Sequence, residues 1–263
     1  MNAVAIPSPL QTAKAVFKGY LPRLLQARGW VLAGLSLVPV GIIMLVVLVM
    51  KLQGERIPPG IAVEVFHKLL AQYFLPIMAL VAAPAGIRED IEQRTIPLML
   101  ARPSTIWALP FGKGMIWFAW GLLWLAIACL GLVSIGGGLE ELPRMVGALA
   151  CAYWAELAFL TLLGLVFKRG ALWGALYLFI WDRAIWILPG NLQRLTFAHY
   201  VENIAGSKSS VVNAAHMLAQ TQIATPALVA ALVLLLAGAA FWALAGWKLQ
   251  ATAIGLAGTE AEG

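Results

Sequence analysis

Three stretches of this chain are apolar and free of charge over the length that a helix needs to cross a lipid bilayer. They are residues 29–50, 114–138 and 226–247. A helix needs about 20 apolar residues to cross the hydrocarbon core, where water is absent and every backbone polar group must bond within the helix. Over the whole chain 62% of residues are hydrophobic and 11% are charged, against roughly 50% and 25% in soluble domains. The sequence therefore predicts an all-α integral membrane protein.

Three further stretches complete a set of six predicted transmembrane helices. Each is long and apolar enough to cross the core, although two of them contain charged side chains. They are residues 69–87, which carry no charge, residues 145–167, which contain Glu156, and residues 170–189, which contain Asp182 and Arg183. Because apolar stretches fill most of the sequence, we expect a single membrane domain over residues 1–263 and no separate hydrophilic domain.

The distribution of basic residues predicts the orientation of the spans. With six spans, the connections on one side carry eleven Lys and Arg residues and those on the other side carry six. Lys and Arg concentrate in cytoplasmic connections, so we expect both termini in the cytoplasm and residues 190–225 as an external connection with short helices. The net charge of +6 comes from residues at the ends of apolar stretches. These residues would meet lipid headgroups, and nucleic acid is not an expected partner.

The N-terminal segment, residues 10–28, combines leucines at roughly helical spacing with four basic residues. The basic residues are Lys14, Lys18, Arg23 and Arg28. This pattern predicts an interfacial helix on the cytoplasmic leaflet, in contact with membrane lipid; the alternative is a frayed basic tail. The first apolar stretch that follows is too long for the core of a cleaved signal peptide, so we expect this span to be retained.

The connection between the second and third predicted spans, residues 88–113, has a distinctive arrangement. A cluster of acidic and basic residues comes first, then an apolar helical turn, then a proline, and finally a Gly-Lys pair at the start of the third span. This order predicts a short cytoplasmic helix whose charged end faces water or a partner while Ile96, Met99 and Leu100 contact the bundle. Such a helix can transmit a partner's movement to the spans beside it. The alternative is a solvated loop with charges flanking the spans.

The same segment resembles the signature of ABC-2 type exporter permeases. In that family an acidic stretch leads into Gly-Thr-Leu, then Leu-Leu, then a proline downstream of the threonine, and Gly-Lys at the start of the third span. In this chain Asp90 and Glu92 precede Thr95. Pro103 follows Thr95 by eight residues, at the family's spacing, and Lys113 completes the Gly-Lys pair. The chain departs from this pattern in two ways. Arg94 stands where family members have a glycine before the threonine, and Pro97 and Pro110 are additional prolines.

These departures affect the expected shape of the turn. The resemblance implies that two such subunits, identical or paralogous, form a pathway for an exported substrate. It also implies that each subunit docks a separate ABC ATPase through a cytoplasmic coupling helix. The docking residues that it implies are Arg88, Glu89, Asp90, Glu92, Arg94, Thr95, Pro103 and Lys113.

The predicted ATPase partner would carry the ATP, the magnesium and the hydrolytic chemistry. This chain has no G-x-x-x-x-G-K-[ST] phosphate loop, the motif that cradles nucleotide phosphates. His67, His199 and His216 lie far apart in the sequence and do not indicate a metal site. We therefore expect no catalytic residue, metal or cofactor on this chain. The resemblance places it in the cytoplasmic (inner) membrane of a prokaryote, and the family's substrates, from drugs and lipids to glycans, peptides and ions, leave the cargo open.

Charged residues inside predicted spans form the second candidate site. Glu156 lies near mid-membrane and Arg183 in the outer third of its span, at depths that the two side chains can bridge if the helices adjoin. A lone charge at the bilayer centre costs about 2.5–3.5 kcal/mol on insertion scales, so we expect Glu156 to pair with Arg183. Asp182 should face elsewhere, because successive helical residues point in different directions. The pair either fixes the helix register or lines a substrate or proton route.

Two other functional classes fit parts of the sequence. An ion- or proton-coupled carrier would use the three intramembrane charges and need no ATPase, but the internal repeats typical of such carriers are not visible. An intramembrane lipid enzyme would need several catalytic polar residues at one membrane depth. Trp117, Trp120 and Trp124 form a stripe on one face of the third span, and we expect this stripe to contact lipid or neighbouring helices.

Overall fold

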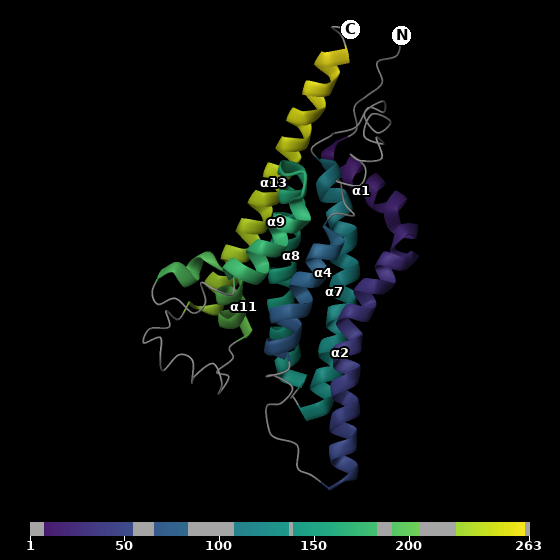
Figure 1. The fold of residues 1–263 in the computed structure, drawn as a ribbon, viewed down its shortest axis with the longest axis vertical. Helices are drawn as coiled ribbons and strands as arrows, with labels where there is room; N and C mark the ends of the chain where they lie inside the picture. Colours follow the sequence, from purple (N-terminus) through teal and green to yellow (C-terminus); the bar gives the residue numbers. More distant parts are fainter. Residues whose placement is uncertain are drawn as a thin grey trace.

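The computed structural model describes six parts of the chain. They are residues 8–54, 66–83, 108–136, 139–182, 191–205 and 225–260. All regular structure in these parts is helical, which confirms the predicted all-α class. The longest helices run along the long axis of the molecule, and α1 and the C-terminal end of α13 lie toward the same end (Figure 1).

Four of the described helices are long and apolar enough to cross a membrane. They are α2 (Ala27–Leu52), α7 (Ala108–Gly136), α8 (Leu142–Val166) and α13 (Ala227–Glu260). They overlap the predicted spans 29–50, 114–138, 145–167 and 226–247. A 3-10 turn, η3 (Leu139–Glu141), leads into α8. The three longest uncharged stretches and the apolar stretch that contains Glu156 therefore mark the four long helices correctly.

The other two predicted spans correspond to shorter described helices. The π-helical segment η2 (Phe66–Phe74) continues into α4 (Leu75–Ala82), and α9 (Gly170–Leu176) continues into the π-helical segment η4 (Tyr177–Trp181). The apolar parts of these helices are shorter than the four long ones. The residues that would complete the predicted spans 69–87 and 170–189 lie outside the described parts, so six spans stays a prediction.

Helices α2 and α7 lie side by side and run in the same direction. Near the N-terminal end of α2, the Gly29 carbonyl accepts a hydrogen bond of 3.0 Å from Trp120 Nε1 of α7. Further along both helices, a Cβ added to Gly131 would lie 2.9 Å from Val40 Cγ1. Because the contact position advances by the same number of residues on both helices, their axes are parallel.

Helices α8 and α13 form a second parallel pair. Trp154 Nε1 of α8 donates a hydrogen bond of 3.1 Å to the Leu235 carbonyl of α13. One turn later on α8, the Phe159 ring lies 5.3 Å from the Phe241 ring, measured between centroids. The positions advance together again, so α13 follows the direction of α8.

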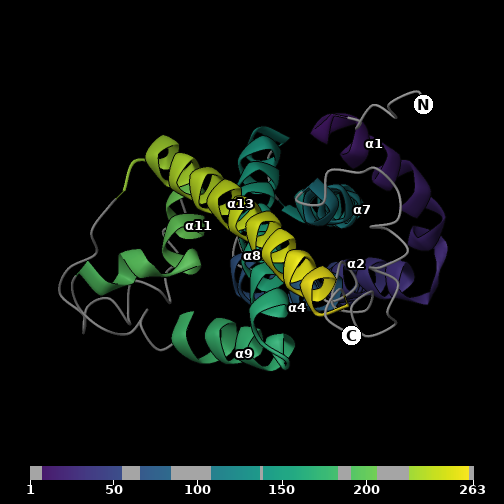
Figure 2. The ribbon, with the colours of Figure 1, turned by 90° about the horizontal axis from the view of Figure 1, so that it is seen from above.

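Helix α8 lies at the centre of the bundle, in contact with α4, α7, α9, α11 and α13 (Figure 2). Tyr153 of α8 is fully buried against α7, where its hydroxyl donates to the Trp117 carbonyl at 3.2 Å. A Cβ at Gly121 would collide with the Tyr153 ring. Glycine at this position therefore allows an aromatic ring to lie against the α7 backbone, as small residues do between membrane helices.

The tryptophan stripe of α7 contacts neighbouring helices, as predicted. Besides the Trp120 bond to α2, the Trp124 ring lies 6.3 Å from the Trp30 ring of α2. Trp117 is buried at the junction with α8. The stripe is therefore part of the helix contacts.

The N-terminal segment forms a helix, α1 (Pro9–Tyr20), followed by a 3-10 turn, η1 (Leu21–Leu25). Ser8 and Gln11 form a reciprocal capping box at the start of α1, which satisfies backbone N–H groups that have no partner within the helix. Pro22 follows, and proline has no N–H to continue an α-helix and clashes with the preceding turn. The predicted helix over residues 10–28 is thus interrupted before α2 begins.

Candidate functional site

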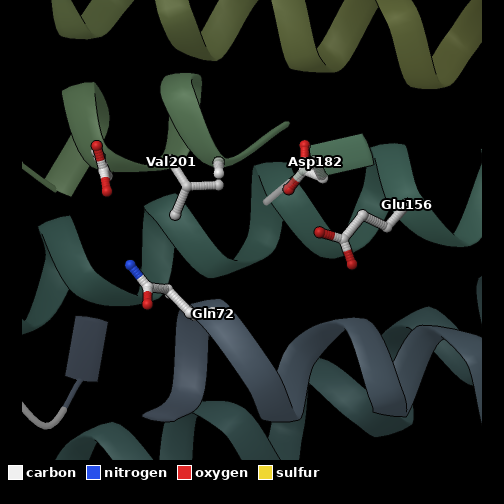
Figure 3. A pocket seen from close by; sticks show the side chains of 7 residues that line it. Gln72, Glu156, Asp182 and Val201 are labelled. Atoms are coloured by element: carbon white, nitrogen blue, oxygen red, sulfur yellow. The ribbon is translucent and has the colours of Figure 1, made fainter. Parts of the chain in front are cut away.

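A pocket lies between η2, α8, the end of η4 and α11 (Phe197–Ala205), and its walls are acidic (Figure 3). It is small, with room for about one water molecule. Its lining residues are Ala71 and Gln72 from η2, Glu156 from α8, Asp182 after η4, and Ala198, Val201 and Glu202 from α11. Carboxylates come from three separate elements, so the acidity arises from the tertiary structure.

Glu156 enters this pocket from the middle of α8 and is only 3% exposed. Figure 3 shows the carboxylates of Glu156 and Asp182 turned into the same space, with the carboxamide of Gln72 on the other side of it. The rest of the buried surface of α8 is largely apolar. Ionisable residues at this depth are costly to bury and commonly have a function in membrane proteins.

Asp182 is also 3% exposed and has a defined structural contact. One of its carboxylate oxygens accepts a hydrogen bond of 2.7 Å from the backbone N–H of Phe197, the first residue of α11. A carboxylate in this position satisfies an N–H that has no partner within the helix and interacts favourably with the helix dipole. Asp182 thus joins the fifth predicted span to α11.

The expectation that Asp182 faces away from Glu156 is wrong, because both residues line the same pocket. The prediction rested on Asp182 and Arg183, as successive residues of a helix, pointing in different directions. The five residues before Asp182 form a π-helical segment, in which hydrogen bonds span an additional residue, so side chains point in other directions than in an α-helix. Arg183 lies outside the described residues, and its pairing with Glu156 stays a prediction.

Glu202 and Gln72 also line the pocket and were not predicted from the sequence. Glu202 shares one face of α11 with Ala198 and Val201, at the i, i+3 and i+4 positions that a helical surface brings together. That spacing is the signal that could have indicated Glu202. Gln72 lies in a π-helical segment, where the α-helical period gives no guide to the side-chain direction.

A set of hydrogen bonds fixes α11 to the start of α13. His199 Nε2 lies 3.0 Å from the Thr225 hydroxyl oxygen. The Thr225 backbone N–H donates to Asn203 Oδ1 at 3.0 Å, and Asn203 Nδ2 donates to the His199 carbonyl at 2.7 Å. Burial of His199, with a smaller contribution from the positive charge of Arg194, lowers the pKa of the imidazole below its usual value. These contacts hold in place the helix that contributes Glu202.

Of the predicted ATPase-docking residues, Lys113 lies in the described part of the chain. The other seven, from Arg88 to Pro103, lie outside it. Lys113 is 2% exposed, and its Nζ lies 4.5 Å from the centre of the Tyr20 ring of α1, a cation–π contact. Next to it, a Cβ added to Gly112 would lie 2.9 Å from the Ala13 carbonyl oxygen. The Gly-Lys pair is therefore the place where α1 lies against the start of α7.

The chemistry of the acidic pocket limits what it can do. Its carboxylates favour a cationic group or exchangeable protons. Within the described residues, no group of three His, Cys, Asp or Glu side chains is arranged to hold a metal ion. The described pocket therefore gives no support for a metal centre.

Comparison of the chain with protein-family models, with curated proteins and with solved structures found no match. The assignment to an all-helical membrane protein therefore rests on the chain's own helices and their contacts. The resemblance of residues 88–113 to a permease signature rests on the residues that carry it.

Proposed function

We propose that this chain is the membrane-spanning subunit of an ATP-driven exporter of the ABC-2 type. The observation that carries the proposal is the position of α1. It is docked on α7 at Gly112 and Lys113, the last two residues of the segment that resembles the ABC-2 signature. A partner that moves this segment would therefore act on α1 and α7 together.

The contacts of α7 give this movement a route into the membrane domain. Helix α7 contacts α2 through the tryptophan stripe and α8 through Tyr153. Protein interiors are close-packed and transmit displacements between packed elements. In the proposed function a separate ABC ATPase binds and hydrolyses ATP with magnesium, and this chain changes conformation without catalysing a reaction. A second copy or a paralogue completes the pathway in the inner membrane of a prokaryote.

The proposal is tested by reconstitution with a candidate ABC ATPase of the same organism. The two proteins should co-purify in detergent, and the permease should stimulate ATP hydrolysis in proteoliposomes. Glu92→Ala, in the proposed docking segment, should reduce the stimulation about tenfold, which corresponds to a loss of about 1.4 kcal/mol. Glu140→Ala removes the same charge from an exposed position between α7 and α8 and should leave the stimulation unchanged. Full transport activity without any nucleotide-hydrolysing partner would contradict the proposal.

A second candidate function is an ion- or proton-coupled carrier, and the acidic pocket favours it. Glu156 and Asp182 meet there, together with Glu202, and carboxylates inside a membrane domain can relay protons. This candidate predicts substrate flux driven by a pH gradient in nucleotide-free proteoliposomes. Glu156→Gln, which cannot release a proton, should abolish that flux. An exporter driven by ATP would show no such flux.

A further inference from the structure

The outward side of α1 and η1 carries positive charge. Thr12 and Ala13 are buried, with Ala13 against α7. Lys14 and Lys18 lie one turn apart on the exposed side of α1, and Arg23 is exposed in η1. We call these three residues the basic face.

An exposed apolar surface adjoins the basic face. Leu21 and Leu25 of η1 are 49% and 65% exposed, and Trp30, in the first turn of α2, is 55% exposed. The Trp30 indole N–H donates to the Leu25 carbonyl at 3.2 Å, so the turn and the indole are held together. This surface lies at the end of a helix long enough to cross a membrane, where tryptophan commonly sits at the level of lipid headgroups.

The charges of the basic face favour an anion. Residues 8–30 contain no Asp or Glu, and like charges four residues apart on a helix repel each other by a few tenths of a kcal/mol. The Arg23 guanidinium carbon lies 4.3 Å from the centre of the Tyr20 ring, the same ring that Lys113 contacts. A guanidinium held in this way presents a planar set of donors that suits phosphate oxygens.

We propose that the basic face binds the phosphate of an anionic phospholipid headgroup, while Leu21, Leu25 and Trp30 contact its acyl chains. An acidic protein would complement the charges but would not account for three exposed apolar side chains beside them. An anionic lipid accounts for both, since it joins a phosphate to hydrocarbon at the membrane surface. The inference does not depend on what the protein transports or on an ATPase.

The test uses the full-length protein in a neutral detergent and follows its thermal unfolding with added short-chain lipid. A ligand that binds the folded state raises the melting temperature. Dioctanoyl phosphatidylglycerol should raise it by several degrees more than dioctanoyl phosphatidylcholine. The triple variant K14Q/K18Q/R23Q should lose this difference, whereas K14R/K18R, which keeps the charges, should retain it.

A matched control removes two other basic residues. Lys168 and Arg169 are exposed in the turn after α8, and K168Q/R169Q should respond to phosphatidylglycerol like the unmodified protein. Because Lys14, Lys18 and Arg23 are all exposed, K14Q/K18Q/R23Q should fold, and circular dichroism checks this. Equal effects of the two lipids, an undiminished response of the triple variant, or the same stabilisation by inorganic phosphate alone or by polyglutamate would overturn the proposal.

Discussion

Asp182 accepts a hydrogen bond from the first N–H of α11, and this contact predicts different effects for two substitutions. Asp182→Ala removes the acceptor, at a cost of about 1 kcal/mol for a helix cap. The amides of residues 197–205 should then exchange with deuterium about fivefold faster, as that energy implies. Asp182→Asn keeps an oxygen in place. In this variant the amides of residues 197–205 should therefore exchange almost as slowly as in the unmodified protein. Unchanged exchange in Asp182→Ala would show that other contacts hold α11.

Glu156 can be tested for a structural or a protonation role by comparing two neutral substitutions. Glu156→Gln keeps the volume and hydrogen-bonding capacity, whereas Glu156→Ala leaves a cavity at a site that is 3% exposed. If the residue is structural, ATP-driven transport by Glu156→Gln should match the unmodified protein at every pH. Glu156→Ala should lower the free energy of unfolding by about 2 kcal/mol, as cavities in cores do. A pH-dependent loss of transport in Glu156→Gln would contradict the structural role.

Glu156 and Asp182 could be identified from the sequence because a charge in an apolar stretch stands out against its neighbours. Their meeting in one pocket could not be predicted, since it depends on how η2, α8, η4 and α11 pack together. Glu202 belongs to a connection without long apolar stretches, so its only signal is its spacing from Ala198 and Val201 on one face of a helix. The part of the site that depends on contacts between distant segments could therefore not be predicted from the sequence.

The contact between α1 and α7 predicts opposite effects for two glycine substitutions. A Cβ at Gly112 would lie 3.2 Å from Val16 Cβ and closer still to the Ala13 backbone, whereas a Cβ at Gly147 of α8 meets nothing within 4 Å. Gly112→Ala should displace α1 and lower the melting temperature. Gly147→Ala should raise it slightly, because alanine is favoured over glycine in helices by up to about 1 kcal/mol. Equal melting temperatures for the two variants would mean that α1 is not docked at Gly112.

The hydrogen bonds between α11 and α13 should weaken in acid. Burial and Arg194 lower the pKa of His199 in the folded protein below its usual value of 6.5, so the unfolded state binds the proton more tightly. The stability that the neutral imidazole contributes is therefore complete above about pH 6.5 and is lost as the pH falls toward the folded-state pKa. Hydrogen exchange of residues 197–205, corrected for intrinsic rates, should accelerate between pH 7.5 and 5.5. His199→Gln should remove most of this dependence on pH.

The helices differ in how far the sequence predicts them. The four long helices follow from long apolar stretches, three of them uncharged, since lipid leaves a chain of that length no other spanning structure. The capped start of α1 follows from Ser8 and Gln11, a recognised capping pair that the charge pattern alone did not indicate. A π-helical segment precedes α4 and another follows α9, and no α-helical periodicity marks those. Amphipathic spacing finds α-helices and misses such segments.

The parallel arrangement of two helix pairs bears on the number of spans. Helices α2 and α7 run in the same direction, so the chain between them must return to the side where α2 begins. Helices α8 and α13 impose the same requirement on the chain between them. The apolar helices α4 and α9 lie in these two intervals. Six crossings meet both requirements, whereas four crossings by the long helices alone would make α2 and α7 antiparallel.

Labelling of single cysteines in intact cells separates these two topologies. With six crossings, the turn between α7 and α8 lies on the opposite side of the membrane from the N-terminus, and the turn after α8 lies on the same side. A membrane-impermeant maleimide should then label Glu140→Cys in intact cells, and label Lys18→Cys and Lys168→Cys after permeabilisation. Four crossings exchange the results for Glu140 and Lys168 and leave Lys18 unchanged. Replacing the native Cys129 and Cys151 by alanine removes background labelling. Labelling of Lys18→Cys identifies the side of the membrane on which the N-terminus lies, so the choice between six and four crossings depends on no assumption about orientation.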